Sequence, residues 1–196
     1  MAEMVISIDR FGVLNAFRRD AASSAAWVGP DPTGVPELVP GAIVAILVRS
    51  ATALNALSVD KNGALNIALY DASAGWLGLD VVGDARFVPG SNIAVIEKTA
   101  ADQFVILIDR FGVLNVFTTD ANVGLQGPDT FGAAVFVPGS SIEVINDGQG
   151  NYAAVLADIN GGLSAFYVDA NDDFVGPEAL GGSVFTPGCS IAGATF

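Results

Sequence analysis

The sequence contains no histidine and one cysteine, Cys189, and its 196 residues include only 8 Lys and Arg against 21 Asp and Glu. Without histidine, Ser-His-Asp and Cys-His nucleophilic systems and the common zinc sites cannot be built. One cysteine cannot form an internal disulfide. A net charge of −13 without a basic patch argues against nucleic acid as a partner. We therefore expect no enzyme, no metal site and no cofactor.

Long apolar runs are also missing, although 52% of the residues are hydrophobic and the mean hydropathy is +0.53. The longest runs resemble residues 42–48, which are too short to cross a membrane and are typical of buried strands. The start, Met1-Ala2-Glu3-Met4, has no basic segment followed by an apolar one. We expect no membrane insertion, and a protein that is cytoplasmic or secreted without a signal peptide.

The chain consists of four copies of one unit. A Pro-Gly pair recurs every 49 residues, at 40–41, 89–90, 138–139 and 187–188. The pattern Asp-x-x-Gly-x-Leu begins at Asp9, Asp60, Asp109 and Asp158, at intervals of 51, 49 and 49 residues. The extra two residues lie in a loop of the first copy, where insertions are tolerated. Repeats with a fixed period of this length are typical of ring or array architectures.

Each unit contains four short apolar segments separated by turn residues, and no segment has a helical period. This pattern predicts an all-β fold, a four-bladed β-propeller formed by residues 1–196 as one domain. The predicted blades are 41–89, 90–138, 139–187, and 188–196 together with 1–40. In this arrangement a C-terminal strand, Ser190–Thr195, completes the blade begun by Met4–Ile8 and closes the ring. A larger ring built from two or more chains is the alternative.

The repeated polar residues have both structural and functional interpretations. The aspartates of Asp-x-x-Gly are placed to accept backbone N–H groups of their turns. Three amides, Asn15, Asn66 and Asn115, follow the repeated leucine. A buried amide needs partners, so these side chains bond either the backbone between blades or a ligand at the blade interface.

Two tryptophans are further candidates for ligand contacts. Trp27 and Trp76 occupy equivalent positions, which Leu125 and Phe174 fill in the other copies. An indole can stack on the apolar face of a sugar while its N–H bonds a hydroxyl. The replacement by Leu and Phe favours an apolar plug between blades, and a ligand-binding surface is the alternative.

The motifs Gly12-Val13-Leu14-Asn15 and Trp27-Val28-Gly29-Pro30, with the second copy's 63–66 and 76–78, each followed by a Pro-Gly pair, resemble the repeats of tectonin-type and related bacterial and fungal β-propeller lectins. The resemblance extends over all four copies. It implies a propeller fold and glycans or glycoconjugates as partners.

The sequence thus favours a non-enzymatic, lectin-like propeller with repeated weak carbohydrate sites that gain from multivalency. The candidate ligand contacts are Trp27, Trp76, Asn15, Asn66 and Asn115. The alternative is a protein-interaction or structural module that assembles with itself and binds no sugar. A homo-oligomer is compatible with both.

Overall fold

The computed structural model describes residues 2–20, 26–99, 102–120, 124–169, 171 and 173–193. In this part of the chain every regular element is a strand, which confirms the all-β prediction. No helix there is long and apolar enough to cross a membrane.

The strands form four antiparallel sheets, one for each copy of the repeat. Sheet 1 contains β1 (Ala2–Ile8), β2 (Leu14–Asp20) and β3 (Val28–Pro32). Sheet 2 contains β4 (Ala45–Val48), β5 (Ala53–Val59), β6 (Leu65–Asp71) and β7 (Gly75–Val82). Sheet 3 contains β8 (Ala94–Thr99), β9 (Asp102–Ile108), β10 (Leu114–Asp120) and β11 (Gly124–Phe131). Sheet 4 contains β12 (Glu143–Asn146), β13 (Tyr152–Ala157), β14 (Leu163–Val168) and β15 (Phe174–Ala179).

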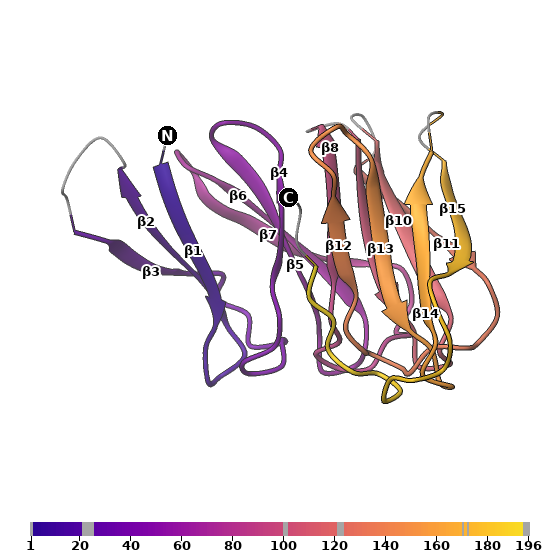
Figure 1. Ribbon diagram of the computed structural model, residues 1–196. Helices are drawn as coiled ribbons and strands as arrows, with labels where there is room; N and C mark the ends of the chain where they lie inside the picture. Colours follow the sequence, from indigo (N-terminus) through magenta and orange to yellow (C-terminus); the bar gives the residue numbers. More distant parts are fainter. Residues whose placement is uncertain are drawn as a thin grey trace.

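The sheets follow one another in chain order, from sheet 1 at one side of the molecule to sheets 3 and 4 at the other (Figure 1). The first strands of sheets 2, 3 and 4 lie beside each other, β4 against β8 and β8 against β12. The outer strands β3 and β7 also touch. Among the described residues, no contact of comparable extent joins sheet 1 to sheet 4.

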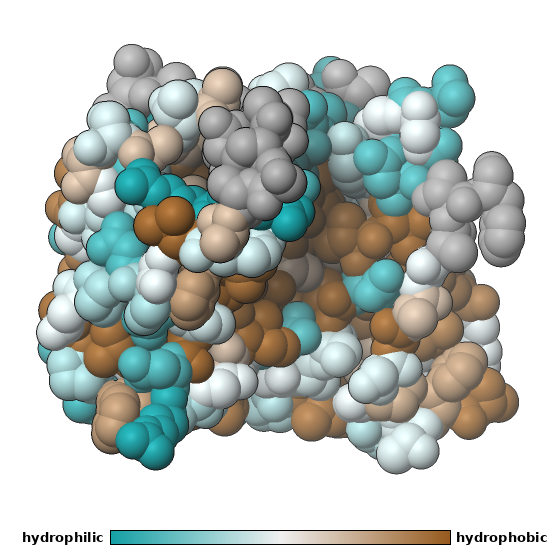
Figure 2. Space-filling view, turned by 90° about the vertical axis from the view of Figure 1, so that its left-hand side faces the viewer, coloured by the Kyte–Doolittle hydropathy of each residue, from teal (hydrophilic) through white to brown (hydrophobic). Residues whose placement is uncertain are grey.

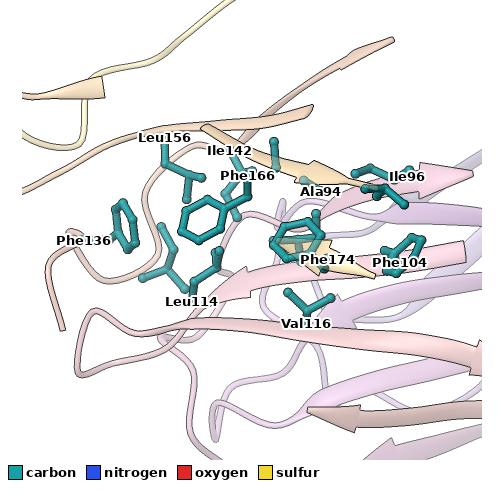
Figure 3. Packing of buried hydrophobic residues seen from close by; sticks show 14 residues of the cluster. Ala94, Ile96, Phe104, Leu114, Val116, Phe136, Ile142, Leu156, Phe166 and Phe174 are labelled. Atoms are coloured by element: carbon teal, nitrogen blue, oxygen red, sulfur yellow. The ribbon is translucent and has the colours of Figure 1, made fainter. Parts of the chain in front are cut away.

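The core lies between the sheets and is dominated by branched and aromatic side chains. Between sheets 3 and 4, Phe166 stacks on Phe174 with ring centroids 5.6 Å apart, and Phe174 meets Phe131 edge-on at 5.1 Å. Figure 3 shows Phe136 and Leu156 near Phe166, and Phe104 and Val116 on the side of Phe174. Because each sheet supplies side chains to both of its neighbours, burial depends on having a sheet on each side.

The Asp-x-x-Gly motif forms the turn between β1 and β2 in sheet 1 and between the two middle strands in sheets 2, 3 and 4. In all four copies one carboxylate oxygen accepts the backbone N–H groups two and four residues ahead, as in Asp109 with Phe111 at 2.9 Å and Val113 at 3.0 Å. The structural interpretation of these aspartates is confirmed. The hydrogen bond from Val13 N–H is the largest cause that lowers the pKa of Asp9 below its ordinary value.

The predicted C-terminal strand is not paired with β1 in the described part of the chain. Sheet 1 has three strands there, and residues 190–193 are not a strand. Instead, the Gly193 N–H donates to Glu143 Oε1 at 3.1 Å, so this segment lies against β12. In the repeat, positions 192–195 are equivalent to Glu143–Asn146, the strand β12. Residues 194–196 lie outside the described residues. Ring closure within one chain stays a prediction.

We predict that Gly112→Ala destabilises the fold by about 3 kcal/mol, because the residue has φ +82° and its Cβ would lie 2.3 Å from the carbonyl oxygen of Phe136. Gly132→Ala is the matched control. Gly132 has φ +72° but no atom within 4 Å of its Cβ position, so only the backbone strain of about 1 kcal/mol remains. Urea unfolding measures both variants, and equal losses would show that the close approach at Gly112 is wrong.

Candidate functional site

The three candidate asparagines are buried beside their own turns. The Nδ2 groups of Asn15, Asn66 and Asn115 each donate to the backbone carbonyl two residues earlier, at 2.9, 3.1 and 2.9 Å. Asn115 Oδ1 also accepts Arg86 Nη1 of the preceding sheet at 3.1 Å, so one of the three bonds across a sheet boundary. Asn66 Oδ1 is buried and has no partner among the described residues.

Trp76 fills the space between sheets 1 and 2. Its indole Nε1 donates to the backbone carbonyl of Asp31 at 2.8 Å, and its ring meets Tyr70 edge-on at 5.1 Å. The ring is half-buried. The indole N–H is therefore already used by the protein, as expected for a plug between sheets.

Trp27, the equivalent residue of sheet 1, is exposed instead. The Arg19 guanidinium lies over its ring, 5.0 Å from the centroid, and also forms an ion pair with Glu3. No sheet of the described chain precedes sheet 1, so no described residue covers this ring in the way that sheet 1 covers Trp76.

The structure separates the candidate asparagines from the candidate tryptophans. In sheet 2, Asn66 pairs with Val81 near one end of β6, while Trp76 pairs with Tyr70 near the other end. Four residues of strand, about 13 Å, lie between Asn66 and Tyr70. The five candidate contacts therefore do not converge on one ligand.

Two cavities lie at equivalent boundaries between sheets. A cavity of about 410 Å³ between sheets 1 and 2 is lined by Ala16, Arg18, Val28, Gly29, Pro30, Asp31 and Tyr70. A cavity of about 600 Å³ between sheets 2 and 3 is lined by Arg49, Ser50, Ala53, Asn55, Ile67, Leu69, Asp80, Val82, Gly124 and Leu125. Both volumes fall in the range of small-molecule sites.

Three lining positions are shared by the two cavities according to the repeat. Ala16 corresponds to Ile67, Arg18 to Leu69, and Asp31 to Asp80. The strand registers agree, because Ala16 pairs with Asp31 and Ile67 pairs with Asp80. The two cavities therefore occupy equivalent positions in two copies of the repeat.

An acidic residue occupies this place in all four copies, as Asp31, Asp80, Asp129 and Glu178 at intervals of 49 residues. This residue is not among the candidates predicted from the sequence, although its period of 49 residues is visible there. All four acids are exposed. The carboxylates of Asp31 and Asp80 receive no hydrogen bond and no ion pair from the described part of the chain.

The residue equivalent to Arg18 lies near the acid in each copy and differs between copies. The polar groups beside the acid therefore differ from one copy to the next. In sheet 1 this residue is Arg18 itself, whose Nη1 donates to the Ala72 carbonyl of sheet 2 at 2.8 Å. In sheet 4 it is Tyr167, and burial together with the neighbouring Glu178 raises the pKa of its hydroxyl above the ordinary value. A carboxylate accepts hydrogen bonds from two hydroxyl groups, and a guanidinium donates to them.

The described residues contain no group of three or more Cys, Asp or Glu side chains placed to hold a metal ion. The two cavities place charged groups that can form hydrogen bonds beside apolar side chains such as Val28, Pro30 and Leu125.

We predict that Trp76→Phe lowers the free energy of unfolding by about 1 kcal/mol, because the hydrogen bond to the Asp31 carbonyl is lost while the ring packing is largely kept. Trp27→Phe is the control, since its indole contacts no acceptor among the described residues, and we expect a change within about 0.5 kcal/mol. Denaturant unfolding followed by circular dichroism compares the two, and equal effects would contradict the assignment of Trp76 as a bonded plug.

No protein-family model matches the sequence, and no curated protein is similar to it in sequence. Solved structures with the same fold do exist. The BP39L lectin from Burkholderia pseudomallei is 24% identical with a TM-score of 0.83, over 95% of this chain and 54% of that one. The Aleuria aurantia lectin, solved as a mutant with alpha-methyl-L-fucoside, is 14% identical with a TM-score of 0.61, over 96% and 58%.

AofleA from Arthrobotrys oligospora, solved as a triple mutant, is 13% identical with a TM-score of 0.63, over 91% of this chain and 60% of that one. The chain therefore spans between half and two thirds of the length of each of these structures. The likeness confirms, at the level of the fold, the resemblance to bacterial and fungal β-propeller lectins.

Proposed function

We propose that this chain is a carbohydrate-binding protein whose sites lie between neighbouring sheets. The observation that carries the proposal is the acid that recurs in all four copies, of which Asp31 and Asp80 each line a cavity without a partner in the described chain. A free carboxylate beside an apolar wall matches a sugar, which has hydroxyl groups around its edge and C–H groups on its face.

The cavity between sheets 1 and 2 is better suited to a sugar than the cavity between sheets 2 and 3. Asp31 lies beside the start of β7, since a Cβ on Gly75 would be 3.1 Å from its Oδ2. Arg18 adds a fixed cation, Val28 and Pro30 add apolar surface, and Tyr70 lines the far side. These groups supply both acceptors and donors to vicinal hydroxyl groups.

The boundary between sheets 2 and 3 offers a second, less polar version of the same site. Leu69 stands in place of Arg18, while Asp80 keeps the carboxylate and Leu125 takes the place of Trp76. We therefore expect weaker binding there. Repetition favours binding over catalysis, because equivalent weak sites add up through multivalency.

The five candidate contacts predicted from the sequence differ in how they relate to the two cavities. Trp76 supports the cavity by holding the Asp31 backbone. Trp27 stays a candidate stacking surface, because its ring is exposed. Asn15, Asn66 and Asn115 stay candidates as well, but neither cavity uses them.

The test begins with a glycan array and with alpha-methyl-L-fucoside, the ligand of the Aleuria aurantia lectin complex. For any sugar bound, isothermal titration calorimetry compares the wild type with Asp31→Asn, Asp80→Asn and the double variant. Because a hydrogen bond to a charged group contributes about 1.5–3 kcal/mol, we predict about a 10- to 100-fold loss of affinity at each altered site.

Asp84→Asn is the matched control, since Asp84 is an exposed acid outside both cavities. It removes the same charge and should leave binding unchanged. The proposal fails if no sugar binds across the array. It also fails if the folded double variant binds as the wild type does.

A further inference from the structure

The two ends of the row of sheets carry opposite halves of an interface that the chain already forms three times. At each internal boundary one apolar residue of the earlier sheet, Leu38, Phe87 or Phe136, bridges to the turn aspartate of the next sheet. These three side chains are only 2–3% exposed. A backbone hydrogen bond crosses beside each of them, from Lys61 to Glu37, from Arg110 to Arg86 and from Ile159 to Val135.

The far end of sheet 4 presents the first half of this interface without a partner. Phe185 follows Phe136 by 49 residues, but it is 45% exposed. Its neighbour Val184, the equivalent of Val135, is 80% exposed. No described residue donates a backbone hydrogen bond to the Val184 carbonyl.

Sheet 1 presents the second half, also uncovered. Val5 is 50% exposed, whereas its equivalents Ala56, Val105 and Ala154 are no more than 2% exposed. Trp27 is exposed where Phe174 is buried. Strand β1 has a hydrogen-bonded neighbour on only one side among the described residues. Figure 2, which faces this side of the molecule, shows apolar side chains in a hollow between two lobes of the surface.

The two ends differ in charge, since residues 1–40 carry three Arg against five Asp and Glu, whereas residues 139–193 carry seven Asp and Glu and no Lys or Arg. Three of the 8 basic residues, Arg10, Arg18 and Arg19, belong to sheet 1 and its turn. No Lys or Arg follows Arg110, while nine Asp and Glu do. Contact between two sheet 4 ends therefore brings two strongly acidic surfaces together, and contact between unlike ends reduces this repulsion.

We propose that the sheet 4 end of one copy packs on the sheet 1 end of a second copy, so that the chain assembles head to tail. In this contact Phe185 of one copy packs against the Asp9 turn of the second copy, just as Phe136 packs against the Asp158 turn within the chain. The contact also covers Val5 of the second copy. Among the described residues, no extended contact joins sheet 1 to sheet 4 of the same chain. Unlike ends that repeat one contact form a ring when the rotation closes.

The test measures mass in solution at micromolar concentrations by light scattering after size exclusion. We expect the wild type at a multiple of 20.0 kDa, and Phe185→Glu and Val5→Glu each at 20.0 kDa. Val184→Glu is a second variant at the sheet 4 end, at a side chain too exposed to affect folding. Phe111→Glu, at a turn residue that is 64% exposed, is the control and should assemble like the wild type.

Mixing the two single variants identifies the unlike contact. Val5→Glu keeps an intact sheet 4 end and Phe185→Glu keeps an intact sheet 1 end, so the mixture should form pairs at twice 20.0 kDa. A wild type that stays at 20.0 kDa overturns the proposal. So does a mixture that stays monomeric although the wild type assembles, because the contact is then not head to tail.

Discussion

The structure depends on the contact that one sheet makes with the turn of the next. At each boundary Leu38, Phe87 or Phe136 reaches the following Asp turn, and the glycine of its own turn leaves room for the backbone at that point. The turn is held rigid by the aspartate carboxylate, which accepts two backbone N–H groups. Because each sheet is completed by its neighbour, stability grows along the row, as in other repeat proteins.

The same boundaries also create the candidate sites. The recurring acid lies on the outer strands, among them β3 and β7, which touch at the boundary between sheets 1 and 2. Aromatic and branched side chains fill the boundary between sheets 3 and 4 (Figure 3), whereas cavities of about 410 and 600 Å³ lie at the other two boundaries. One repeated interface thus supplies the core, the candidate binding sites and, at the two ends, surfaces suited to another copy.

The all-β fold and its four repeated sheets could be predicted from the sequence because their determinants are local and periodic. The Pro-Gly pairs and the Asp-x-x-Gly turns give the period, and the short apolar runs give the strands. The candidate site could not, because Asp31 and Asp80 look like ordinary surface acids until the strand register places them beside a cavity. The tryptophans stand out in the sequence, yet the partner of the Trp76 indole, the Asp31 carbonyl, lies 45 residues away. Pairing of the C-terminal segment depends on which sheet it reaches, which no local pattern encodes.

A crystal structure of the chain with a bound monosaccharide tests the central claim, that the sheet boundary is the functional unit, most directly. The account predicts sugar density between sheets 1 and 2, with ring hydroxyl groups on the Asp31 carboxylate and near Arg18. Sugar bound on the Asp-x-x-Gly turns or elsewhere away from every sheet boundary, with the Asp31 and Asp80 carboxylates left unused, would contradict it.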